Sequence, residues 1–171
     1  MKIETGYYLE KFQKSLEQLD KQEAFHQKKL ECKVGIWLDS VVLKIQKQNW
    51  TNASAEPFGE GIFFSVWLND ESIGKGKLYY NIHALKLRGL TGHTIKSRAF
   101  AEAFRLQFKS FESKWPNVSV DFGPLTLMEG WVSIIDHEQI PDIVTNLASG
   151  FSEIDFIIND LLSERKIGLK R

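Results

Sequence analysis

Two segments in which apolar side chains alternate with other residues constrain the fold more than any other feature of this sequence. The apolar positions of the first are Ile62, Phe64, Val66 and Leu68. The second begins at Lys77, after the turn-forming sequence NDESIGKG. Because successive side chains of a β-strand point to opposite faces, the pattern predicts two strands paired as an antiparallel hairpin. Trp67 falls on the face opposite Phe64, where it would form either a contact surface or a second core.

Three other segments repeat apolar residues at three- and four-residue spacing, which is typical of amphipathic helices. The first covers about residues 7–30, and its apolar residues are Leu9, Phe12, Leu16 and Leu19. The middle helix starts near Thr94 or Ser97 and ends before Pro116; its apolar stripe consists of Phe100, Phe104, Phe108, Phe111 and Trp115. The third covers about residues 140–166, where Ser149-Gly150 leaves open whether there is one helix or two.

The remaining segments add strands. Residues 33–50 fit either a helix or two short strands with a turn at Asp39-Ser40, and their β-branched and aromatic residues favour the strands. Strand-like segments lie on either side of the Gly123-Pro124 turn, with alternating apolar residues over 118–122 and a longer segment over 125–135. They predict two more strands. The order of elements is roughly α-β-β-β-α-β-β-α. It indicates an α+β fold with a single, mostly antiparallel sheet and helices packed on one face.

Length and composition suit one domain. The chain has 171 residues, of which 43% are hydrophobic, and this is enough for a core that needs no disulfide or metal. We expect a single globular domain over residues 1–171. Its N-terminal helix would lie at about 7–30, the sheet with the middle helix at about 33–135, and the C-terminal helical segment at about 140–166.

Several features predict a cytoplasmic protein without membrane contact. Residues 1–13 carry charges where a secretory signal has a continuous apolar stretch. No apolar run approaches the roughly 18 residues that span a bilayer. The single cysteine, Cys32, excludes an internal disulfide and a cysteine-based zinc cluster, and a lone thiol suits a reducing compartment.

Signatures of catalysis are largely missing. The sequence has no phosphate-binding loop, HExxH motif, EF-hand loop or nucleophile elbow, and its four histidines are widely spaced. It leaves open whether the protein is an enzyme and favours a binding protein with no cofactor and no metal. The alternative is a divalent-metal-dependent phosphate-ester enzyme, in which Asp121 and Glu129 bind the ion and His83 lies nearby.

The charges are segregated although the whole chain is neutral, with 22 Lys and Arg against 22 Asp and Glu. Residues 75–109 contain eight Lys or Arg and one Glu, whereas residues 110–164 contain one Lys and ten Asp or Glu. Such asymmetry indicates a surface for a polyanion, a surface for an acidic partner, or two segments that attract each other. The same attraction between neighbouring chains would give a self-associating structural protein and a homo-oligomer.

The run from Leu78 to Leu90 supplies the candidate binding surface. Its apolar residues change parity after Ala84, so either the strand ends there or a β-bulge near Ala84 or Leu85 compensates. With a bulge, one polar strand face would carry aromatic, amide, imidazole and cationic groups, and Lys96 would extend it. The candidate binding residues are Tyr79, Asn81, His83, Lys86, Arg88 and Lys96.

The predicted function is a soluble, non-enzymatic binding or adaptor domain. Its basic, aromatic-containing strand face would bind nucleic acid or an acidic protein segment. In the first case Tyr79 would stack on a base, and Lys86 and Arg88 would neutralise phosphates.

Overall fold

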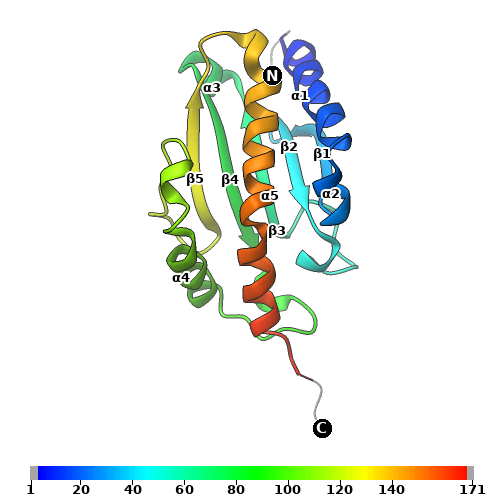
Figure 1. Ribbon diagram of the computed structural model, residues 1–171, viewed down its shortest axis with the longest axis vertical. Coiled ribbons are helices and arrows are strands. Elements are labelled where there is room, and N and C mark those ends of the chain that lie inside the picture. Colours follow the sequence, from blue (N-terminus) through cyan, green and yellow to red (C-terminus); the bar gives the residue numbers. More distant parts are fainter. Residues whose placement is uncertain (1–3, 169–171) are drawn as a thin grey trace.

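The computed structural model describes residues 4–168 and contains a five-stranded antiparallel sheet (Figure 1). The strands lie side by side in their order along the chain, and each pairs with the next. They are β1 (Glu31–Trp37), β2 (Ser40–Gln46), β3 (Gly61–Leu68), β4 (Lys77–Leu85) and β5 (Thr126–Ser133). The predicted α+β fold with a single antiparallel sheet is confirmed.

The long helices lie on one face of this sheet (Figure 1). α1 (Thr5–Asp20) contacts β1 and β2, α5 (Ile140–Glu164) contacts β3, and α4 (Ser97–Phe108) contacts β5. The shorter helices lie in the connections: α2 (Glu23–Gln27), α3 (Asp70–Gly74) and the 3-10 turns η1 (Gln48–Trp50), η2 (Leu87–Gly89), η3 (Glu112–Lys114) and η4 (His137–Gln139). No helix within residues 4–168 is both long enough and apolar enough to cross a membrane.

Five segments that the sequence left uncertain or misassigned are resolved. The middle helix, expected to end before Pro116, ends at Phe108 and is followed by the separate 3-10 turn η3. The helix expected over residues 7–30 is two helices, because the apolar stripe stops at Leu19 and the chain turns at Lys21. Residues 33–50 contain β1 and β2, as the favoured interpretation held. Residues 118–122 form only an isolated bridge, since the amides of Asp121 and Phe122 bond within the segment instead of to a neighbouring strand. The C-terminal segment is one continuous helix.

Stacked aromatic rings form the centre of the core, between the sheet and α5. The rings of Phe64 in β3 and Phe151 in α5 are parallel to within 9°, with centroids 4.6 Å apart. Trp115 and Trp50 pack edge-on against this pair, Trp115 on Phe64 and Trp50 on Phe151. Burying each such ring stabilises the fold by roughly 1.5–3 kcal/mol, so these contacts hold α5 over the middle of the sheet.

Gly130 allows β5 to approach β4 closely. It pairs with Tyr80, whose hydroxyl donates to the Pro116 carbonyl oxygen at 2.6 Å. A Cβ at position 130 would overlap the Tyr80 hydroxyl and lie 2.9 Å from that carbonyl oxygen. The glycine therefore fixes where the Tyr80 ring can lie.

We expect Gly130→Ala to lower the free energy of unfolding by roughly 1–3 kcal/mol, because the added methyl forces Tyr80 or the strand to move. Urea unfolding followed by circular dichroism measures this. Gly74→Ala is the matched control, since no atom lies within 4 Å of the position of its Cβ. Equal losses in the two variants would contradict the packing described for Gly130.

A candidate ligand-binding groove on the open face

The sheet face turned away from α1, α4 and α5 is called here the open face. The strand register arranges its side chains in rows that cross the strands. One row is mostly aromatic and consists of Val42, Trp67, Tyr79 and Trp131, from β2 to β5. The rings of Trp67 and Tyr79 stack with centroids 4.8 Å apart and an interplanar angle of 14°. The Lys77 ammonium lies 4.0 Å from the centroid of the Trp131 ring, so a cation borders this row.

The next row across the open face is polar. It consists of Lys33, Lys44, Ser65, Asn81 and Glu129, one residue from each strand. Lys44, Ser65 and Asn81 are buried, although the long helices lie on the other side of the sheet. Asn81 Nδ2 donates to Glu129 Oε1 at 3.2 Å. The sheet thus holds a buried strip of a cation, a hydroxyl and an amide next to an aromatic strip.

A groove of about 620 Å³ lies over these two rows. Its walls include Trp37, Phe63 and His83 besides members of both rows. The Trp37 indole folds back along β1 over Gly35, where a Cβ would come within 3.2 Å of the ring. A volume of several hundred Å³ with aromatic walls and a few polar groups is typical of ligand sites in proteins.

Lys44 has no counter-ion in this groove. Its Nζ donates to the Phe58 carbonyl oxygen at 2.9 Å and lies 4.3 Å from the Trp37 ring centroid and 4.7 Å from that of Phe63. Within the described part of the chain, no carboxylate oxygen lies within 4.0 Å of this nitrogen. Burial, with a smaller contribution from the charge of Lys33, lowers the pKa of Lys44. Because buried charges are normally paired, the groove favours a ligand that brings a negative charge.

Two further side chains in the groove are notable, Asn81 for a hydrogen-bond acceptor and His83 for its pKa. Asn81 is 3% exposed, and its Oδ1 is buried with no hydrogen-bond partner among residues 4–168. Burial, followed by the charge of Lys44, lowers the pKa of His83, while a backbone hydrogen bond with Leu125 acts in the opposite direction. The lowered pKa favours the neutral form of His83. Lys44 is the lysine among the residues that line the groove.

The rim of the groove exposes an apolar side chain. Leu38, in the β1–β2 turn, is 99% exposed and has a φ of 51°. Positive φ is costly for residues other than glycine, and such turns favour Asn or Gly. Leu38 therefore adds an exposed apolar side chain to the rim of the aromatic groove.

The structure brings together three of the six residues predicted to bind a ligand. Tyr79, Asn81 and His83 share the open face, and the register irregularity lies between Ile82 and His83 rather than near Ala84 or Leu85. The other three lie beyond the end of β4. Lys86 has a φ of 57° and pairs with Glu60 at 3.0 Å, while Arg88 in η2 and Lys96 before α4 are exposed.

Sequence reasoning missed Trp37, Lys44, Phe63, Ser65 and Trp131 as members of this surface. Residue 67 was singled out as a possible contact, and it does line the groove. The parity of β3 was a usable signal for Phe63 and Ser65, because both alternate with the core residues of that strand. The assignment of Lys44 depended on the turn position in residues 33–50, which the sequence left open.

The geometry of the described residues bears on the proposed carboxylate pair and on contacts between the two charged segments. Glu129 accepts the hydrogen bond from Asn81, and Asp121 is exposed. Within residues 4–168, no group of three or more His, Cys, Asp and Glu side chains is placed to hold a metal ion. In the same range, no ion pair within 4.0 Å joins residues 75–109 to 110–164, although Arg105 donates hydrogen bonds to the carbonyl oxygens of Gly123 and Thr126.

A comparison with known protein families, with curated proteins and with solved structures finds no match for this chain.

Lys44 and Lys47 make a matched pair for testing the electrostatics of the groove. We expect Lys44→Met to leave the free energy of unfolding unchanged or to raise it by up to about 2 kcal/mol, because a buried cation without a carboxylate is replaced by an apolar side chain. Lys47 instead lies 3.0 Å from the buried carboxylate of Asp155. Lys47→Met should therefore lower the free energy of unfolding by about 1–3 kcal/mol in the same urea titration, since Asp155 then keeps only Lys28, at 3.4 Å. A larger loss in Lys44→Met than in Lys47→Met would contradict this account.

Proposed function

We propose that this protein is a non-enzymatic binding domain that holds nucleotide units of single-stranded nucleic acid on its open face. The observation that carries the proposal is Lys44, a buried cation without a carboxylate partner, set between the rings of Trp37 and Phe63. A nucleotide combines a negative charge, which Lys44 lacks as an ion-pair partner among the described residues, with a flat ring that the aromatic walls accept. The phosphate would pair with the Lys44 ammonium, and the base would lie against the neighbouring rings.

The aromatic row supports stacking of more than one base. Trp67, Tyr79 and Trp131 lie on three adjacent strands, and Trp37 forms a separate wall of the groove. Stacking on an aromatic side chain contributes about 1–3 kcal/mol per base and tolerates any base sequence. Because strands lie about 4.8 Å apart, a single strand laid across the sheet would meet successive rings.

The polar row supports recognition of base edges. Bases present hydrogen-bond donors and acceptors side by side, and the row offers the Ser65 hydroxyl, the unpartnered Asn81 Oδ1 and the Glu129 carboxylate. An acidic protein segment would use only the cations of this surface and would leave its rings and carboxylate without a role. The open face therefore suits a nucleotide better than an acidic peptide.

Fluorescence anisotropy of a labelled single-stranded oligonucleotide, titrated at two salt concentrations, tests the proposal. We expect binding that weakens as salt rises, because Lys44 and Lys77 displace counterions from the phosphates. Trp67→Ala should raise the Kd by roughly tenfold to a hundredfold through lost stacking, and Lys44→Met by about tenfold through the lost charge-assisted contact. Titration with a mononucleotide separates binding of one unit from binding of a strand.

Lys109→Met is the matched control for charge, since Lys109 is exposed at the end of α4. Its Kd should stay close to that of the unchanged protein. Unchanged affinity in both Trp67→Ala and Lys44→Met would contradict the open face as the binding surface. Binding of a poly-glutamate peptide that depends on Lys44 and is indifferent to Trp67 would favour the acidic-segment alternative.

A further inference from the structure

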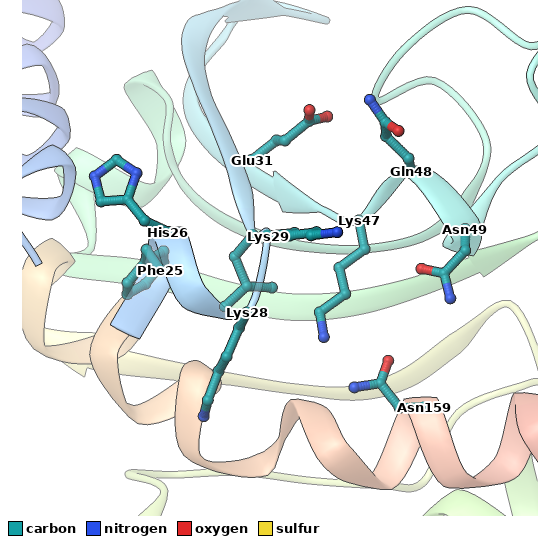
Figure 2. Close-up of a pocket in the computed structure, with 10 residues that line it drawn as sticks. Phe25, His26, Lys28, Lys29, Glu31, Lys47, Gln48, Asn49 and Asn159 are labelled. Atoms are coloured by element: carbon teal, nitrogen blue, oxygen red, sulfur yellow. The ribbon is translucent and has the colours of Figure 1, made fainter. Parts of the chain in front are cut away.

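A second recess, of about 750 Å³, lies on the other side of β1 and β2, beside α5 (Figure 2). Three parts of the chain that are distant in sequence form it. The loop after α2 contributes Lys28 and Lys29, the end of β2 with η1 contributes Lys47 and Asn49, and α5 contributes Asn159. It shares no lining residue with the groove on the open face, so it is a separate candidate site.

The lysines of this recess are only partly neutralised. The carboxylate of Asp155 is buried and lies 3.0 Å from Lys47 Nζ and 3.4 Å from Lys28 Nζ. Lys28 also donates to the Ser152 carbonyl oxygen. These contacts hold two ammonium groups in place with a single negative charge. Lys29 adds a third positive charge, and Glu31 adds one further carboxylate to the lining. The balance is positive by one charge.

The Asn159 amide is oriented by the core. Its Oδ1 accepts a hydrogen bond from the Trp50 indole at 3.0 Å, and Trp50 is fully buried. The amide nitrogen is thereby left as the group that Asn159 presents to the recess. Figure 2 shows Asn159 on the α5 side, with Lys47 extending toward it and Asn49 on the adjoining wall. The recess thus gathers ammonium and amide donors from several directions.

Lys29 occupies a backbone conformation that favours glycine. Its φ is 57°, in the left-handed region, and its side chain is exposed at the recess. Lys29 directly follows the C-terminal cap of α2, where a left-handed residue commonly ends a helix.

We propose that this recess binds a phosphate group, through Lys29, Lys47, Asn49 and Asn159. A tetrahedral oxyanion accepts hydrogen bonds from several directions at once and neutralises the unpaired positive charge. The phosphate is either the free ion or the terminal group of a larger molecule. This site does not depend on the nucleotide-binding role proposed for the open face.

Isothermal titration calorimetry with inorganic phosphate, at ionic strength held constant with sodium chloride, tests the proposal. Asn159→Asp keeps the acceptor for Trp50 and replaces the donating amide by a carboxylate that repels the anion. We expect it to weaken phosphate binding by at least about tenfold, and Lys29→Gln, which removes an exposed charge, by about threefold to tenfold. Lys21→Gln is the matched control, because Lys21 is exposed at the end of α1 and lies outside the recess, and its Kd should stay unchanged.

A second arm uses a 5′-phosphorylated dinucleotide and its unphosphorylated counterpart. Tighter binding of the phosphorylated form, lost in Lys29→Gln and kept in Trp67→Ala, would assign the site to a terminal phosphate; binding of inorganic phosphate alone would assign it to the free ion. The absence of any phosphate-specific heat in the unchanged protein would overturn the proposal. Equal weakening by Lys29→Gln and Lys21→Gln would also overturn it, because the effect would then be one of net charge.

Discussion

The stacking of Phe64 on Phe151 is the contact on which the arrangement of the molecule depends. It joins the central strand of the sheet to the middle of the longest helix. The indole rings of Trp50 and Trp115 pack edge-on against Phe151 and Phe64, respectively. With α5 held there, α1 and α4 fill the spaces on either side and pack against it. All the long helices are thereby committed to one face of the sheet.

Because the long helices all pack on one face of the sheet, the other face is left uncovered by them. This uncovered face is also rich in aromatic residues. In an ordinary two-layer fold this second face would be polar and solvated. Here Trp37, Phe63 and Trp67 surround buried Lys44 and Asn81 instead. The burial of a cation without a carboxylate lowers the free energy of unfolding, and a bound ligand with a negative charge would offset this loss. Stability therefore resides in the helix-covered face and the proposed binding in the open one.

The fold was predictable from local patterns, but the groove was only partly so. The alternation of apolar residues in β3 and the phenylalanine stripe of α4 predicted the antiparallel sheet and its helix-covered face. Burial of one face makes apolar residues recur at regular spacing along a strand or helix. Tyr79, Asn81 and His83 followed from the same parity in β4. Lys86 and Arg88 did not, because the left-handed backbone at Lys86 ends the strand, and single-sequence patterns do not reveal such a turn. The recess beside α5 joins three distant segments, so no local pattern could indicate it.

The tryptophan indole resonances report directly on whether the open face binds a ligand. Trp37 and Trp67 line the groove and Trp131 extends the aromatic row, whereas Trp115 is buried beside α5. In ¹H–¹⁵N spectra of the protein titrated with a short single-stranded oligonucleotide lacking a terminal phosphate, the account predicts progressive shifts of the Trp37 and Trp67 indole signals and a stationary Trp115 signal. Binding that leaves the Trp37 and Trp67 signals in place would contradict it.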